Sequence, residues 1–123
     1  WLPVNNNYQE INVTAQDKDP NSCLNYFRKM VAFRKNNPIL VYGDYELELP
    51  DDEQIFAYTR TQDDKKLLIL LNFSTEQVTT NISERFNLKQ EPVINNYPSV
   101  SMDETSLVLE AYQALIFEVE KSL

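Results

Sequence analysis

The sequence contains no histidine, one glycine (Gly43) and one cysteine (Cys23) among its 123 residues. Without histidine, the chain cannot build a Ser-His-Asp triad, an H-E-x-x-H zinc site or a Cys-His nucleophile pair. A single glycine excludes the G-x-G-x-x-G and Walker A phosphate-binding loops, and a single cysteine excludes an intrachain disulfide and a cysteine-based zinc cluster. We therefore expect no catalytic, cofactor-binding or metal-binding residue within this chain.

Positive charge is also scarce, with 11 Lys and Arg against 19 Asp and Glu and a net charge of −8. This balance disfavours nucleic acid and anionic membranes as partners, because phosphate binding needs a basic surface that releases counterions. The longest apolar run, Leu67 to Leu71, is far shorter than the roughly 18 residues of a membrane span. The chain begins with Trp1 and shows no signal peptide. We expect a cytoplasmic protein and a piece of a longer polypeptide.

Apolar residues make up 42% of the chain, including 7 Tyr and 6 Phe. A chain of this length buries roughly two-thirds of its unfolded surface. The composition therefore predicts a hydrophobic core that needs no disulfide or metal to hold it.

One helix is predicted near the start of the chain. Residues 1–18 are polar and rich in asparagine, which is typical of a loop. Asp19-Pro20 favours a helix start, because aspartate can cap free N–H groups and proline suits the first helical position. Asn36-Asn37-Pro38 ends the pattern, since the residue before proline is pushed out of the α region. A helix over 20–36 would carry one apolar stripe, formed by Leu24, Phe27 and Val31.

The chain after Pro38 is predicted to form short strands separated by polar turns. Leu67 to Leu71 is apolar on both faces, which indicates a central strand covered on two sides. Because glycine is nearly absent, Asp and Asn must supply the turns. The predicted strands are 39–42, 45–49, 54–61, 67–71, 77–82, 92–95, 106–109 and 114–119.

The pattern predicts an all-β fold, an antiparallel Greek-key β-sandwich preceded by one α-helix. A sandwich covers its own inner faces. The helix must therefore either pack on the outside of a sheet or belong to another domain upstream.

Several runs in chain order resemble bacterial oligo-1,6-glucosidases, which are α-glucosidases of glycoside hydrolase family 13, the α-amylase superfamily. The resemblance covers residues 1 to about 75 well and is weaker beyond. The runs are Asp19-Pro20-Asn21-Ser22, Tyr26-Phe27-Arg28-Lys29, Arg34-Lys35-Asn36-Asn37-Pro38, Val41-Tyr42-Gly43-Asp44-Tyr45-Glu46-Leu47, Pro50-Asp51-Asp52-Glu53-Gln54-Ile55-Phe56-Ala57-Tyr58-Thr59-Arg60 and Leu70-Leu71-Asn72-Phe73-Ser74.

The resemblance implies a (β/α)8 barrel followed by a C-terminal β-sandwich. Residues 1–37 would be a loop and the last helix of the barrel, and residues 38–123 the C-terminal domain. Trp1 to Tyr8 would be the loop after the eighth barrel strand. The family's aspartate nucleophile, glutamic acid–base and second aspartate would lie upstream of Trp1, on the missing barrel.

The carboxylates of the chain do not suggest a replacement for that machinery. Retaining hydrolysis needs two carboxyl groups about 5 Å apart, one of them with a raised pKa. Most acids here lie in turns such as Asp51-Asp52-Glu53, where water keeps them ordinary. Trp1 to Tyr8 could contact substrate, but we favour packing against neighbouring loops or fraying at the terminus. For Cys23 we favour a packing role over a reactive thiol. Three glycosylation-type triplets, at Asn12, Asn72 and Asn81, carry little weight without a secretory signal.

The leading hypothesis is a non-catalytic part of an α-glucosidase that hydrolyses α-1,6 or α-1,4 bonds of short oligosaccharides. Its partner would be the catalytic barrel of the same polypeptide, which this region would brace. Without the barrel, the stripe of Leu24, Phe27 and Val31 would find cover on the sandwich or in a homodimer. The alternatives are a carbohydrate-binding module, disfavoured by the single terminal Trp1, and an immunoglobulin-like interaction domain.

Overall fold

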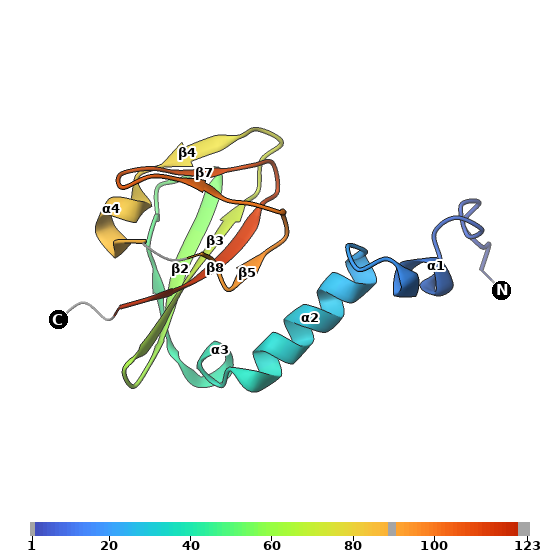
Figure 1. Ribbon diagram of the computed structural model, residues 1–123, viewed down its shortest axis with the longest axis horizontal. Coiled ribbons are helices and arrows are strands. Elements are labelled where there is room, and N and C mark those ends of the chain that lie inside the picture. Colours follow the sequence, from blue (N-terminus) through green and yellow to red (C-terminus); the bar gives the residue numbers. More distant parts are fainter. Residues whose placement is uncertain (1, 89–90, 121–123) are drawn as a thin grey trace. The chain divides into compact units, whose positions relative to one another are not determined.

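The computed structural model describes residues 2–88 and 91–120 (Figure 1). The chain divides into two compact units, Trp1–Pro38 and Ile39–Leu123. Within the described residues, no helix is both long and apolar enough to cross a membrane.

The first unit contains two helices, α1 (Val13–Lys18) and α2 (Cys23–Asn36). The prediction of a loop over 1–18 was wrong at its end, because the Asn12 side chain accepts a hydrogen bond from the Ala15 N–H at 2.9 Å and starts α1. Helix α2 begins later than predicted, since Ser22 caps it through the N–H of Asn25. Its end at Asn36 is as predicted.

Polar contacts, more than apolar burial, tie the first unit together. Gln16 is central, because its carbonyl accepts bonds from Ser22 Oγ (2.6 Å) and Asn25 Nδ2 (2.9 Å). An ion pair between Arg28 and Asp17 adds a further link between the two helices. Neither α1 nor α2 has a buried residue, and Phe27 is 65% exposed. This unit therefore has no hydrophobic core of its own within the described chain.

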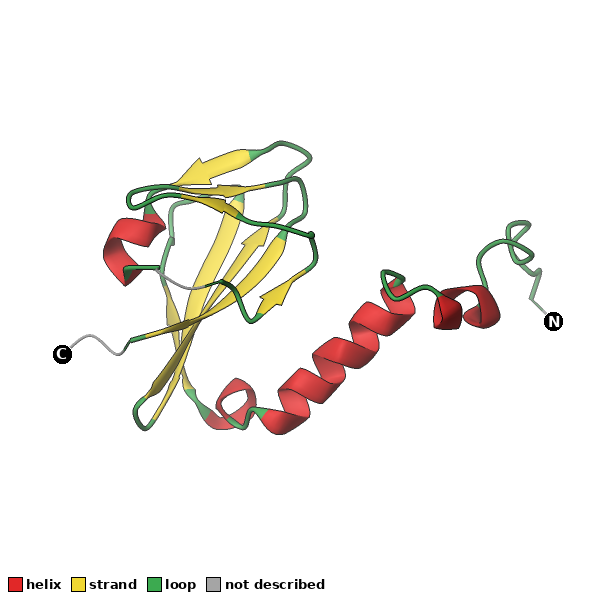
Figure 2. Cartoon of the chain, viewed as in Figure 1, coloured by secondary structure: helices red, strands yellow, loops and turns green. Residues whose placement is uncertain are grey.

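The second unit is an antiparallel β-sandwich, which confirms the predicted fold class (Figure 2). Its described residues form a five-stranded sheet in the order β1-β2-β3-β8-β5 and a three-stranded sheet in the order β4-β7-β6. The strands are β1 (Asp44–Leu47), β2 (Ile55–Gln62), β3 (Lys65–Asn72), β4 (Val78–Thr80), β5 (Ile94–Asn95), β6 (Ser101–Met102), β7 (Leu107–Leu109) and β8 (Ala114–Val119).

Strands distant in sequence are neighbours in this sandwich. β3 pairs with β8 in the larger sheet, with Leu68 opposite Phe117 and Leu70 opposite Leu115. The strand after β3 and the strand before β8, β4 and β7, pair with each other in the smaller sheet. The connections from β3 to β4 and from β7 to β8 therefore both cross from one sheet to the other.

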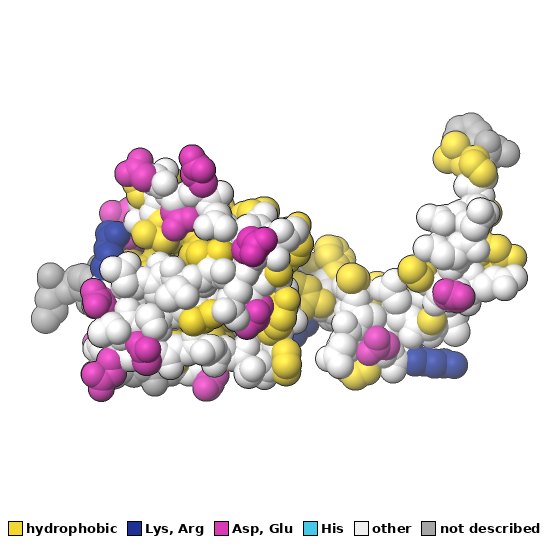
Figure 3. Space-filling view, turned by 90° about the horizontal axis from the view of Figure 1, so that it is seen from above, with side chains coloured by type: hydrophobic (Ala, Val, Ile, Leu, Met, Phe, Trp, Pro, Cys, Tyr) yellow, Lys and Arg dark blue, Asp and Glu magenta, His cyan; other side chains and the backbone are white. Residues whose placement is uncertain are grey.

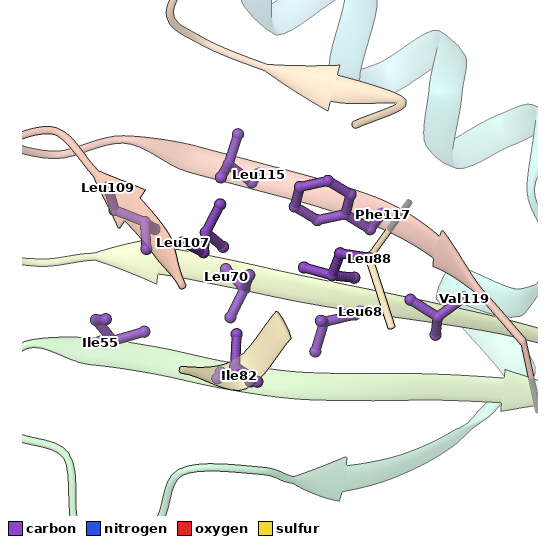
Figure 4. Close-up of a cluster of buried hydrophobic side chains, with 11 residues drawn as sticks. Ile55, Leu68, Leu70, Ile82, Leu88, Leu107, Leu109, Leu115, Phe117 and Val119 are labelled. Atoms are coloured by element: carbon purple, nitrogen blue, oxygen red, sulfur yellow. The ribbon is translucent and has the colours of Figure 1, made fainter. Parts of the chain in front are cut away.

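The core lies between the two sheets and is built mainly from β2, β3, β7 and β8 (Figure 4). Leu68 and Leu70 of β3 point into it and are fully buried, together with Leu107, Leu109 and Leu115. On the other face of β3, Leu67 and Ile69 are also buried. The predicted central strand covered on both faces is thus confirmed.

Two local predictions in the second unit were wrong, and one short strand was not predicted. Ile39–Tyr42 is a single helical turn, α3, and not a strand, because the Gly43 N–H donates to the Ile39 carbonyl four residues back at 3.0 Å. The strand predicted over 77–82 ends at Thr80 and is followed by helix α4 (Ile82–Phe86). The two-residue strand β6 had no signal in the sequence.

Gly43 stands where a side chain would collide with backbone. A Cβ there would lie 2.6 Å from the Ile39 carbonyl oxygen and 2.9 Å from that of Thr61. Among the described residues, left-handed backbone occurs instead at Asp63, Asn87 and Tyr112, with φ of 56°, 49° and 55°. The prediction that Asp and Asn replace glycine in turns is confirmed at two of these positions, and Tyr112 is the exception.

Candidate functional site

An aromatic surface covers part of the five-stranded sheet on the face opposite the core. The registers place Leu47 opposite Tyr58 and Phe56 opposite Leu71, so these side chains share one face. The Phe73 N–H donates to the Gln54 carbonyl at 2.9 Å and continues this ladder past β3. We call this surface the outer face; it consists of Tyr45, Leu47, Phe56, Tyr58, Leu71 and Phe73.

The rings of the outer face touch in series. Tyr45 and Tyr58 have centroids 5.3 Å apart, Phe56 and Tyr58 5.2 Å, and Phe56 and Phe73 6.5 Å. Their planes are tilted by 35°, 41° and 57°. Such tilted pairs are favourable for aromatic packing. They do not form the coplanar strip that a carbohydrate-binding module needs.

A shallow hollow of about 160 Å³ lies beside these rings. Phe56, Phe73 and Leu47 contribute to its apolar lining, and Asp52 and Glu53 bring two carboxylates to it. Asp52 Oδ1 accepts the N–H groups of Gln54 (2.9 Å) and Ile55 (2.7 Å), so this carboxylate shapes the turn. The loop between β1 and β2 therefore forms most of the wall of the hollow.

Buried amides hold the loops at the same end of the sandwich. Asn72 is 3% exposed, donates to the Glu76 and Glu110 carbonyls at 2.8 and 2.9 Å, and accepts from the Ser74 N–H. Gln113 is likewise buried, and its Oε1 accepts the Glu110 N–H at 2.8 Å. These bonds are costly to break, because a buried amide left unpaired loses its hydration without compensation.

Tyr112 projects from the turn before β8. Its N–H donates to the Ser74 carbonyl at 3.2 Å, and its own carbonyl accepts from Asn96 Nδ2 at 2.9 Å. Tyr97 supports the same turn by donating its hydroxyl to the Ala111 carbonyl at 2.8 Å. The Tyr112 side chain remains 58% exposed next to the segment that carries Phe73.

The exception among the acids is Glu48, which is buried although most other carboxylates are exposed as predicted. Its Oε1 accepts from Thr59 Oγ1 and its Oε2 pairs with the Arg85 guanidinium, both at 2.8 Å. The sequence did not indicate the burial of Glu48, because a glutamate between Leu47 and Leu49 in a strand is expected to face solvent. Over residues 2–88 and 91–120, no group of three or more His, Cys, Asp or Glu could hold a metal ion.

The other singled-out residues lie scattered over the chain. Trp1 is outside the described residues, and 2–8 are exposed. Cys23 is exposed, so the expected packing role is not seen. Two of the three glycosylation-type triplets contain a buried residue, Asn72 in one and Ser83 in the other. In the third, the Asn12 side chain caps α1.

The stripe predicted on the helix is present on α2. Leu24 and Val31 are half-buried and Phe27 is exposed. The stripe therefore has apolar surface left for a partner, and the identity of that partner stays a prediction.

Two family models match this chain and leave only a short gap between them. Residues 1–43 match the α-amylase catalytic domain, and residues 55–116 match the C-terminal domain of the α-amylase SusG. The chain belongs to the α-amylase superfamily, glycoside hydrolase family 13. The predicted family is thereby confirmed.

Relatives in this family share the whole length of the chain. The oligo-1,6-glucosidase of Parageobacillus thermoglucosidasius is 37% identical over 97% of this chain, and that of Bacillus cereus is 36% identical over 98%. Isomaltulose synthase from Klebsiella sp. LX3 matches the structure with a TM-score of 0.86, and trehalose-6-phosphate hydrolase from Bacillus licheniformis with 0.85, at 32% and 29% identity over 98% of this chain. The chain spans 22% of the length of each of these proteins.

Proposed function

We propose that this chain is the C-terminal part of an α-glucosidase and has a structural role, bracing the catalytic barrel of the same polypeptide. The observation that carries the proposal is the match of residues 1–43 to the catalytic-domain model, followed directly by the sandwich. Residues 1–37 would contribute a loop and the last barrel helix, and residues 38–123 would form the C-terminal domain.

The chemistry of the described residues supports the view that catalysis takes place outside this chain. Retaining hydrolysis needs a carboxylate nucleophile close to a carboxylic acid. The most deeply buried carboxylate among the described residues, Glu48, is engaged by Thr59 and Arg85. In barrels of this kind the active site is built by the loops at the C-terminal ends of the strands.

The substrate of the whole protein would be the non-reducing end of a short α-linked glucoside. We favour α-1,6 bonds because two relatives carry the name oligo-1,6-glucosidase. An isomaltulose synthase and a trehalose-6-phosphate hydrolase are similar in structure at comparable identity, so α-1,4 and other linkages stay within the proposal. The proposed location is the cytoplasm.

The stripe of Leu24, Phe27 and Val31 is proposed to face the remainder of the barrel. In the 123-residue chain alone, a second copy could cover the same stripe, because Phe27 is 65% exposed. Sedimentation of the chain over a range of concentrations separates a dimer from a monomer.

The proposal is tested by comparing the purified 123-residue chain with the whole protein. Each is incubated with isomaltose and with a nitrophenyl α-glucoside, and glucose and nitrophenol are measured. We expect release by the whole protein and none by the chain. Release by the chain at an enzyme-like rate would contradict the structural role, and no release by the whole protein would contradict the α-glucosidase.

A further inference from the structure

The segment just before α1 is an ordered turn made of exposed residues. We call residues 5–11 the N-terminal turn. Within it, the Tyr8 N–H donates to the Asn5 carbonyl at 3.1 Å. The Ile11 N–H donates to the Asn7 carbonyl at 2.8 Å. Within the described chain, the turn is therefore closed by backbone bonds and not by apolar packing.

The side chain of Asn12 joins this turn to α1. Its Nδ2 donates to the carbonyls of Tyr8 and Gln9, both at 3.1 Å. Its Oδ1 accepts the Ala15 N–H at 2.9 Å and caps the helix. One amide therefore has two separable tasks, because its oxygen starts α1 and its nitrogen holds the turn.

A second amide, that of Gln16, continues the connection to α2. Its Oε1 accepts the Leu24 N–H at 3.0 Å, and its backbone carbonyl accepts from Asn25 Nδ2 at 2.9 Å. Asn12 and Gln16 are the only partly buried residues between positions 2 and 21. The position of the N-terminal turn relative to α2 is therefore set by two amide side chains acting through α1.

The chemistry of the N-terminal turn suits a neutral sugar. Asn5, Asn6 and Asn7 carry amides, which both donate to and accept from hydroxyl groups. The Tyr8 side chain is 54% exposed and combines an apolar ring with a polar hydroxyl. No Lys or Arg precedes Lys18, and Figure 3 shows mostly uncharged side chains over the N-terminal end of the first unit. These groups favour a glucosyl unit over a sugar phosphate.

We propose that Asn12 is a positioning residue, which holds the N-terminal turn where the turn contacts a neutral glucosyl unit of the substrate. This inference rests on the proposed function, in which α2 is the last barrel helix. The turn then belongs to the loop that leads from the last barrel strand to that helix, and such loops build the active site of these barrels. The backbone bonds of the turn disfavour fraying, which supports the contact with substrate that the sequence left open.

The first test compares Asn12→Asp and Asn12→Ser with the unmodified whole protein in the hydrolysis of isomaltose. Asp and Ser cap helices about as well as Asn, so both variants keep the start of α1, but neither has an amide nitrogen to hold the turn. The KM should rise about tenfold, because a turn that is in place for only about a tenth of the time weakens apparent binding by that factor. The kcat should change less than about twofold, since the interaction is regained once substrate is bound.

The control is Asn21→Ser, at an exposed position of the same unit, which should change neither KM nor kcat. A purely structural role of Asn12 would lower the thermal midpoint and the active fraction and leave the KM unchanged. An unchanged KM in both Asn12 variants, with normal turnover by the unmodified protein, therefore overturns the role of Asn12. Absence of turnover by the unmodified protein contradicts the α-glucosidase instead. Faster hydrolysis of trehalose 6-phosphate than of isomaltose would contradict the neutral substrate.

The second test needs no turnover and measures hydrogen exchange in the whole protein. In Asn12→Asp and Asn12→Ser, backbone amides of residues 5–11 should exchange about tenfold faster, because the side-chain bonds to the Tyr8 and Gln9 carbonyls are lost. Amides in the middle of α2 should exchange at their original rates in both variants. Unchanged exchange in the N-terminal turn would show that Asn12 does not hold it and would overturn the proposal.

Discussion

The two units of this chain differ in how far they bury their apolar side chains. The sandwich buries its leucines against one another, with Leu68, Leu70, Leu107 and Leu115 fully buried. Helices α1 and α2 bury none of theirs and are joined by polar contacts around Gln16 and by the Arg28–Asp17 pair. Both regions have regular apolar patterns, so the pattern alone does not say whether the partner is in the chain.

This difference indicates the source of each unit's stability. Apolar burial is the main favourable term in folding, at about 25 cal/mol per Å² removed from water. The sandwich gains that term from its own residues. The helical unit does not gain it from its own residues, and under the proposed function the remainder of the barrel would supply it.

The largest effect should follow from opening the sandwich core with Leu70→Ala. Leu70 is fully buried opposite Ala57 and Leu115, so we expect a loss of about 2–5 kcal/mol of unfolding free energy. Urea denaturation followed by circular dichroism measures it. Leu47→Ala, in the exposed strand β1, is the control and should cost much less. Similar losses for both variants would show that the core is not where the structure places it.

Gly43→Ala should have the next largest effect, at the start of the sandwich. The new Cβ would meet the backbone oxygens of Ile39 and Thr61, which cannot move like the end of a side chain. Overpacking of this kind costs about 1–3 kcal/mol. Asp44→Ala, at the exposed neighbouring position, is the control for the same urea measurement. An unchanged midpoint for Gly43→Ala would mean that α3 and β2 separate easily at this point.

Phe27→Ser tests the helical unit, where the apolar stripe of α2 is exposed in this chain. In the 123-residue chain the ring is 65% exposed, so the unfolding free energy should change by less than about 0.5 kcal/mol. In the whole protein the same substitution should cost several-fold more if the barrel covers α2. Lys29→Ser, also exposed on α2, should have a small effect in both proteins. Equal small effects of Phe27→Ser in both would remove the support for a covered stripe.

The strands could be predicted because sequence pattern and burial agree there. Ala114–Val119 was predicted with its observed bounds, and the alternation of Ile55 and Ala57 with Phe56 and Tyr58 correctly separated the two faces of β2. Ile39–Tyr42 failed because four apolar residues fit one helical turn as well as a strand. The bond from Gly43 to Ile39 that decides between them is not visible in composition.

The outer face could not be predicted from the sequence, because it too depends on contacts between residues in different strands. Alternation shows that Phe56 and Tyr58 share a face, but it does not show that the face is exposed or that Phe73 lies on it. The position of Phe73 depends on the pairing of β2 with β3, which the bond from the Phe73 N–H to the Gln54 carbonyl continues. Glu48 was missed because its burial requires Arg85, which lies far along the chain on α4.

The smallest effect concerns a turn on the three-stranded sheet that is held by polar contacts, as the helical unit is. The N–H groups of Thr105 and Ser106 donate to Asp103 Oδ1 at 2.8 and 2.7 Å and lower the pKa of Asp103 from 3.8 to about 2. Because the folded pKa is depressed, this stability is present above pH 3.8 and is lost as the pH falls toward 2. Urea midpoints of Asp103→Asn should therefore lie slightly below those of the unmodified chain near pH 5 and converge with them near pH 2. Glu104→Gln is the control, and a gap for Asp103→Asn that stays constant over this range would show that the carboxylate charge does not hold the turn.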